Sequence, residues 1–199
     1  LFEFLVLESS QAGLSWITIL KKREGYRKAF CDFDAGQVAQ MTDEDVERLM
    51  RFEGIVRNRL KIKSTITNAK LFLAVQKEFG SFYNYTLSFF PDGKPIINTV
   101  HSLSDIPVSS PQSDAMSKDM KKRGFKFFGT TICYAHLQAS GFVNDHLAGC
   151  ICRQTTEVKC QYNSAFTGLF VRFGLLLVLI SYLCYPKAIN VNRIYEPFL

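Results

Sequence analysis

The chain has few of the residues that mark several common protein classes: one tryptophan, three histidines and six prolines. Its apolar residues do not alternate with polar ones over any long stretch, and this argues against a β-sandwich or a barrel. The six cysteines lack the spacing of a small disulfide scaffold, and no secretory signal accompanies them. These absences favour a helical protein of a reducing compartment.

Long uncharged hydrophobic runs are also scarce. The cleanest run, residues 173–185, contains no charge but is shorter than the ~20 residues that a membrane-spanning helix needs. Only when Arg172 is included does the stretch 165–185 approach that length. Three interpretations stay open for it: a membrane anchor, a helix packed on the body, or sequence foreign to the domain. We favour the third and expect no membrane partner.

What the chain does contain is the composition of a globular protein. It has 199 residues, of which 47% are hydrophobic and 21% charged, and its net charge is +6. This length can bury a substantial core. Basic residues cluster at 21–28, 57–63 and 118–126. Such clusters suit a polyanionic partner, although most basic clusters are simply solvated faces.

Apolar residues recur at helical spacing along most of the chain. Glycines and capping residues punctuate this pattern, and the connections between the segments are short. We therefore predict an all-α body. The predicted helices cover residues 15–30, 35–41, 43–50, 57–79, 81–89, 114–123, 129–140 and 144–150.

The stretch from Glu8 to Trp16 is the first candidate site. Glu8 lies late in an apolar helix, where Phe4, Leu5 and Ala12 would share its face. A carboxylate buried there requires a partner, such as a cation or N–H donors supplied by a ligand. Gly13 should end the helix and leave residues 11–15 as a tight exposed tip. The alternative for Glu8 is an ordinary solvated glutamate. The alternative for Trp16, the residue after the tip, is a side chain that belongs to the hydrophobic core.

A second candidate is the segment 118–131, which should form a helix, a glycine-bracketed turn and another helix. Gly124 and Gly129 flank a basic and aromatic turn. Backbone N–H groups of the turn and of the next helix can point at one phosphate, and neighbouring lysines would add salt-sensitive affinity. The alternative is an ordinary helix connection with a solvated basic face.

A third candidate is the pair His146 and Cys150, spaced to share one face of the predicted helix 144–150. That spacing allows both side chains to bind one zinc ion. Two ligands make half of a tetrahedral site, and the alternative is a buried histidine with an inert cysteine.

Together these stretches resemble the 3-methyladenine branch of the helix-hairpin-helix DNA glycosylase superfamily. The resemblance covers residues 1–152 and implies a helix-hairpin-helix bundle that hydrolyses the N-glycosidic bond of 3-methyladenine in double-stranded DNA. It also implies a monomer without an obligate protein partner, working at the nucleoid in a bacterial cytoplasm. The resemblance rests on Glu8 with residues 11–16, on 20–24, on 121–134, and on 143–146 with Cys150.

The resemblance assigns the catalytic role to Glu8, whose carboxylate would accept hydrogen bonds from the cationic base, while Trp16 would stack on that base. Asp145 lies where related enzymes place a catalytic aspartate, and we expect it to be structural first. The residues implied in DNA binding are Gln11, Gly13, Leu14, Lys122, Gly124, Lys126, Gly129 and Thr130.

The chain departs from the family pattern at both ends. The family has an N-terminal segment with a cysteine and a histidine that complete a zinc site, so His146 and Cys150 would lack these partners here. Residues 153–199 have no family counterpart and suggest a gene-boundary or frame-shifted extension. An alternative function is therefore a DNA-binding remnant with impaired catalysis. A membrane-anchored protein is a third possibility, based on residues 165–185.

Overall fold

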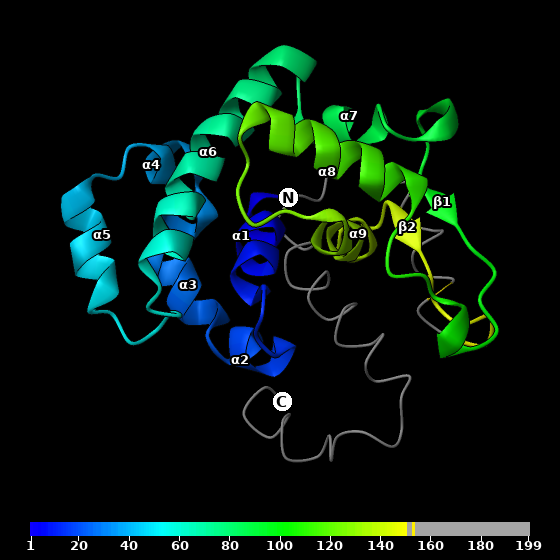
Figure 1. Cartoon of the computed structure of the whole chain (residues 1–199), viewed down its shortest axis with the longest axis horizontal. Coiled ribbons are helices and arrows are strands. Elements are labelled where there is room, and N and C mark those ends of the chain that lie inside the picture. Colours follow the sequence, from blue (N-terminus) through cyan, green and yellow to red (C-terminus); the bar gives the residue numbers. More distant parts are fainter. Residues whose placement is uncertain (151–152, 154–199) are drawn as a thin grey trace. The chain divides into compact units, whose positions relative to one another are not determined.

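The computed structural model describes residues 1–150 and Arg153, and in this part of the chain it is mostly helical (Figure 1). The predicted all-α class is confirmed. The helices are α1 (Phe2–Gln11), α2 (Trp16–Lys21), α3 (Arg23–Ala29), α4 (Ala35–Ala39), α5 (Asp43–Met50), α6 (Arg59–Phe79), α7 (Phe82–Leu87), α8 (Pro111–Arg123) and α9 (Thr130–Ala139). Two short strands are β1 (Ile96–Ile97) and β2 (Val143–Asn144).

The described chain forms two compact units. The first comprises Leu1–Pro95 and Pro107–Leu137, and it holds α1 to α8 with most of α9. Its core is rich in aromatic side chains from α1, α6 and α7. Phe72 stacks on Phe82 with ring centroids 4.5 Å apart, and Phe2 lies 5.2 Å from Phe72. Aromatic pairs of this kind add to the free energy of area burial, so they fix how the three helices pack.

The second unit comprises Ile96–Ile106 and the described residues from Gln138 onward. Here β1 and β2 pair in parallel, and the predicted helix over 144–150 is wrong. The backbone groups that such a helix would use are engaged elsewhere: the Asn98 N–H donates to the Asn144 carbonyl, and the Ala148 N–H donates to the Val100 carbonyl. Pairing with a segment distant in sequence has overridden the local helical pattern.

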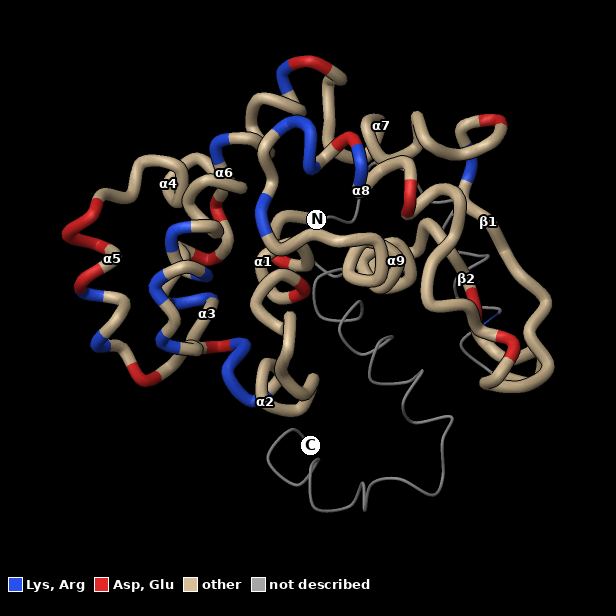
Figure 2. Tube along the Cα trace, viewed as in Figure 1, with Lys and Arg blue, Asp and Glu red and all other residues tan. Residues whose placement is uncertain are grey.

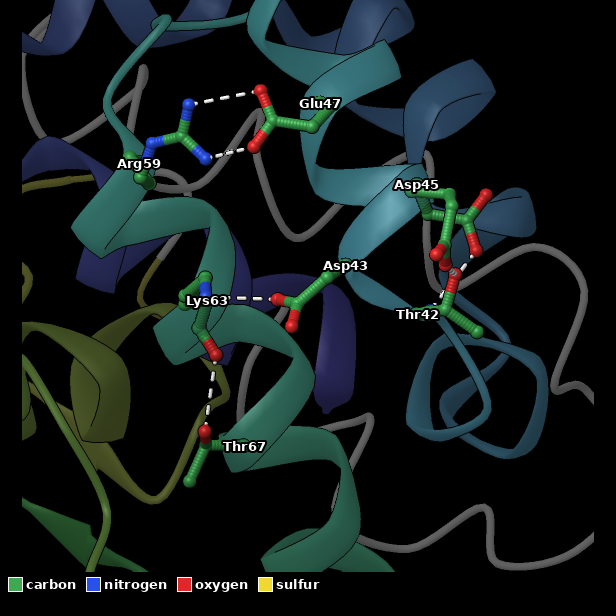
Figure 3. A network of polar contacts seen from close by, with 8 residues as sticks. Thr42, Asp43, Asp45, Glu47, Arg59, Lys63 and Thr67 are labelled. Atoms are coloured by element: carbon green, nitrogen blue, oxygen red, sulfur yellow. Dashed lines mark hydrogen bonds and ion pairs between the residues drawn. The ribbon is translucent and has the colours of Figure 1, made fainter.

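Helix α5 is attached to α6 by ion pairs (Figure 3). Arg59 donates two hydrogen bonds to the Glu47 carboxylate, and Lys63 lies 2.8 Å from Asp43. These side chains are largely exposed, so solvent screens both pairs and their contribution to stability is small. Thr42 begins α5 as predicted, and its backbone N–H donates to the Asp45 carboxylate at 3.0 Å.

Several helix boundaries differ from those that periodicity predicts. The predicted helix over 15–30 is divided at Lys22 into α2 and α3. Helix α8 begins at Pro111, because the Ser110 hydroxyl accepts a hydrogen bond from the Ser113 N–H at 3.2 Å and so caps the helix one turn earlier. Capping chemistry, rather than apolar spacing, determines where this helix begins.

The predicted tail, residues 153–199, lies outside the described residues except for Arg153, and so does its hydrophobic run at 165–185. Among the helices of the described part, none has both the length and the apolar character that crossing a membrane requires.

Candidate functional site

The carboxylate of Glu8 is buried in the middle of an apolar helix, and 1% of the residue is exposed. Its neighbours Leu5 and Leu7 are also buried. One carboxylate oxygen, Oε2, has no hydrogen-bond partner among the described residues, and neither has the adjacent Ser9 hydroxyl. Burial raises the pKa of Glu8 well above the ordinary carboxyl value. The alternative of a solvated helix glutamate is therefore wrong.

An unpartnered buried polar atom destabilises the free protein by about 1–3 kcal/mol. A structure retains such an atom where a ligand provides the missing partner, and perturbed carboxyl groups gather at functional sites for this reason. A ligand with a positive charge or N–H donors fits Glu8, because it would satisfy Oε2 and favour the ionised carboxylate.

A buried histidine that the sequence did not single out adjoins the α1 face that carries Glu8. The ring of His136 contacts Phe4, one turn before Glu8, with centroids 6.5 Å apart, and contacts Phe128 at 5.4 Å. Burial lowers the pKa of His136 to about 3, so the imidazole is neutral at physiological pH. One feature of the sequence could have indicated it, namely a histidine among the apolar positions of the predicted helix 129–140.

The tip after α1 is a tight turn closed on itself. Gly13 has a φ of +77°, which favours glycine, and the Leu14 N–H donates to the Gln11 carbonyl at 2.6 Å. The Gln11 side-chain amide donates to the Leu14 carbonyl, also at 2.6 Å. Gly13 and Ser15 are exposed, whereas Gln11 and Leu14 are half-buried. The predicted tip is thus present, with its fully exposed part confined to two residues.

Trp16 is half-buried and is the first residue of α2. Ser15 occupies the N-cap position of α2, but its hydroxyl pairs with the Thr18 hydroxyl at 2.7 Å rather than with the helix backbone. The tip therefore places the indole immediately after a turn, at the start of a new helix.

The predicted hairpin joins α8 to α9. Gly124 ends α8 with a φ of +104°, and buried Phe125 and Phe128 anchor the turn on either side. Between these anchors Lys126 is exposed, as are Gly129 beyond them and Lys122 on α8. The side chains of Lys122 and Lys126 are thus open to solvent, as phosphate binding requires.

Thr130, the first residue of α9, is half-buried, and its hydroxyl donates to the Asp114 carboxylate. The Ser113 hydroxyl lies 3.1 Å from the Thr130 hydroxyl oxygen. The Thr130 side chain is thus used to join α8 to α9.

Much of the basic charge near the hairpin and tip is neutralised within the protein. Arg123 pairs with Asp119 and with Glu78, each at 2.6 Å, and both carboxylates raise its pKa. Arg23 pairs with Glu3 at 2.7 Å. Figure 2 shows acidic residues along α5 and basic residues at the end of α8 and the turn that follows. The lysines of that turn are thus the better phosphate ligands.

His146 and Cys150 are close together although no helix joins them: the His146 Nδ1 and Cys150 Sγ atoms are 3.7 Å apart. Two ligands of one tetrahedral zinc ion lie about 3.5 Å apart, given ordinary Zn–N and Zn–S bond lengths. The pair therefore fits half of a zinc site. The part of the chain that the structure describes contains no group of three or more potential metal ligands.

Asp145 is held on both oxygens. Asn98 donates to one at 2.6 Å and Gln138 to the other at 2.7 Å. This arrangement agrees with the expectation that Asp145 is structural, since its carboxylate joins three segments of the second unit.

A glycine hairpin with exposed lysines, connected through Phe128 and His136 to the face of α1 that bears a buried carboxylate, is the arrangement of a helix-hairpin-helix protein. Residues 1–154 match the family model of the methyladenine glycosylases. The chain therefore belongs to the methyladenine glycosylase family.

Individual relatives agree with this assignment. The chain is 52% identical over 152 residues to DNA-3-methyladenine glycosylase 1 of Escherichia coli (strain K12), covering 76% of this chain and 81% of the relative. A crystal structure of 3-methyladenine DNA glycosylase I is 54% identical, with a TM-score of 0.72 and coverage of 76% and 82%. A variant of such an enzyme, solved in complex with 3-methyladenine, is 40% identical, with a TM-score of 0.73 and coverage of 76% and 81%.

The burial of Glu8 makes the stability of the protein depend on pH. Because its pKa is higher in the folded than in the unfolded state, Glu8 contributes stability that is complete below the unfolded pKa and is lost as pH rises through the folded pKa. The neutral variant Glu8→Gln avoids this loss. We expect it to melt at a higher temperature than the wild type at pH 8, with the difference disappearing toward pH 4.

Thermal melts of both proteins across this pH range measure the difference directly. The lowered pKa of His136 also makes stability depend on pH, but this contribution is the same in the wild type and in Glu8→Gln, so it cancels in their difference. A difference in melting temperature that does not change with pH would contradict a buried, ionisable Glu8.

Proposed function

We propose that this chain removes 3-methyladenine from alkylated DNA by hydrolysing the N-glycosidic bond, which leaves an abasic site. The family and the relatives named above support this reaction. The single observation that carries the proposal is the buried Glu8 carboxylate with an unpartnered oxygen, because 3-methyladenine in DNA carries a positive charge and N–H donors. No comparison favours the alternative of a DNA-binding remnant without catalysis.

Methylation weakens the glycosidic bond, so the base is already a good leaving group. The protein then has to extrude the base from the duplex and hold it, while favouring the charged base over normal adenine. An ionised Glu8 attracts the cationic base, and the base in turn lowers the free energy of ionising Glu8. Normal adenine lacks the positive charge, so its binding would leave the buried Glu8 without a cationic partner and would be less favourable.

Trp16 supplies the stacking surface for the extruded base in this proposal. A cationic ring on an indole face gains attraction beyond apolar contact. The half-buried position of Trp16 next to the tip supports this role. Separately, the rings of neutral His136 and half-buried Phe4 contact each other beside the face of α1 that bears Glu8.

Two loops hold the DNA. The tip residues Gln11, Gly13 and Leu14 occupy the gap that the extruded base leaves. The hairpin binds phosphates through the backbone around Gly124, Gly129 and Thr130, and through the side chains of Lys122 and Lys126. We further propose that the protein acts as a monomer, without an obligate protein partner, on nucleoid DNA in the bacterial cytoplasm.

We also propose that His146 and Cys150 are half of a structural zinc site. The 3.7 Å separation of their ligand atoms supports this. Bound zinc would join the end of the second unit to whichever segment provides the other ligands, and it would take no part in the reaction.

Replacement of the acid tests the proposed selectivity. We expect Glu8→Gln to lower the single-turnover rate of 3-methyladenine release by roughly 10²-fold or more, as the loss of one preorganised charged group does in other active sites. Affinity for duplex DNA should remain close to that of the wild type, because the hairpin is intact. Glu53→Gln, at an exposed position, is the matched control. Unchanged release by Glu8→Gln would remove this residue from the reaction.

Loss of one hairpin lysine tests the phosphate contact. Lys126→Ala should weaken binding to duplexes of every sequence and reduce the slope of log K against log salt by about 1. Titration of a fluorescent duplex at several salt concentrations gives both values. Lys28→Ala removes an exposed lysine of α3 and should leave the slope near that of the wild type. Equal slopes for both variants would exclude Lys126 as a phosphate ligand.

The proposed zinc site is tested by cobalt substitution. Cobalt bound to a thiolate gives a charge-transfer absorption band, and we expect this band in the full chain and its loss in Cys150→Ser. Cys133→Ser, which changes a buried cysteine of α9, is the control. A wild-type chain that shows no band would contradict the proposal.

A further inference from the structure

Helix α6 carries two buried polar side chains on one face. Lys61 is 9% exposed and Asn68 is fully buried. The two are seven residues apart, which is two helical turns, so they project in nearly the same direction about 10 Å apart along the axis. Lys61 lies within the basic cluster 57–63, and Asn68 belongs to none of the sequence patterns that point to DNA binding or catalysis.

Lys61 reaches the end of α1. Its Nζ atom donates to the Ser10 carbonyl at 2.9 Å and to the Ala12 carbonyl at 2.6 Å. The last carbonyls of a helix lack partners within it, and a cation there is favourable. At Ala12 the backbone leaves the helix with φ −43° and ψ 113° and turns into Gly13. Lys61 therefore holds the residues from which the tip departs.

Asn68 reaches the hairpin. Its side-chain amide donates to the Lys126 carbonyl at 3.0 Å, and its Oδ1 accepts from the Lys126 N–H at 2.9 Å. Both polar groups of one exposed hairpin residue are thus bound by a single buried side chain. The next residue, Phe127, has a backbone φ of +54°, which residues other than glycine adopt infrequently. This turn therefore needs support from the surrounding structure.

Helix α6 is itself held in place by contacts with other helices. Arg59 and Lys63 pair with α5 (Figure 3), and Phe72 packs against Phe2 and Phe82 in the core. A helix held in this way is a rigid support. Since Lys61 and Asn68 project from it at a fixed separation, the loops bonded to them acquire a fixed separation as well.

We propose that Lys61 and Asn68 are positioning residues that set the distance between the tip and the hairpin, so that the tip enters the duplex at the base whose flanking phosphates the hairpin holds. The proposal rests on the function proposed above. Neither side chain needs to touch DNA: Lys61 acts through the tip backbone, and Asn68 acts through the Lys126 peptide. Small errors in such positioning reduce rates strongly, by about 10²-fold for 1 Å.

The test compares Lys61→Met with Lys63→Met, and Asn68→Ala with Asn84→Ala. The control residues are a lysine of α6 in an exposed ion pair and an asparagine that donates to the Phe79 carbonyl. Each full-length variant is assayed for thermal stability, binding of free 3-methyladenine, duplex affinity, and the fluorescence of 2-aminopurine placed next to the lesion, which reports extrusion of the base.

We expect Lys61→Met to reduce extrusion and single-turnover excision by roughly 10²-fold, with duplex affinity and free-base binding near those of Lys63→Met. Asn68→Ala should instead weaken duplex affinity, because the hairpin loses its support. Asn68→Asp keeps the acceptor for the Lys126 N–H and loses the donor, so its effect should be intermediate. This variant also provides a result if Asn68→Ala fails to fold.

Two outcomes would overturn the proposal. In the first, Lys61→Met and Asn68→Ala behave like their controls. In the second, free-base binding, extrusion and stability decline together, which indicates general loss of structure. A wild-type chain that extrudes the base without releasing it would contradict the proposed function, and the extrusion and affinity measurements would still decide the positioning role.

Discussion

The rest of this protein depends on one unfavourable placement, an acid inside an apolar helix. Glu8 could be solvated at little energetic disadvantage on a surface helix, but here α1 is covered along nearly its whole length. Burial raises the pKa of the acid and leaves one of its oxygens without a partner in the described chain. In the proposed function a cationic base would remove both penalties, and the instability of the free protein would become selectivity for a charged ligand.

The surroundings of this acid explain how the selectivity is connected to DNA. The hairpin residue Phe128 contacts His136, and His136 contacts Phe4 on α1. Helix α6 adds direct hydrogen bonds to both loops through Lys61 and Asn68. The two loops that would contact the duplex are thus fastened to one rigid element, while arginines such as Arg123 are engaged in ion pairs within the protein.

Local sequence predicted most of the helices because capping residues and apolar spacing act over a few residues. It was wrong over 144–150, where pairing with a strand some fifty positions earlier decided the conformation. The proximity of His146 and Cys150 was nevertheless anticipated, although for a different reason: a turn after β2, rather than a helix, brings the two side chains together. The prediction from local sequence also missed the break between α2 and α3 at Lys22, because no glycine or proline marks this position.

The sequence by itself determined the helical class, the family resemblance, the tip at Gly13 and the glycine hairpin, since each depends on residue types at short fixed spacings. The tertiary structure alone decided that Glu8 is buried, that His136 is neutral, and that Lys61 and Asn68 bind the two loops. Burial and long-range hydrogen bonds depend on which distant segments pack together. A carboxylate, an imidazole, an ammonium group and an amide look the same in sequence whether they meet water or the inside of a protein.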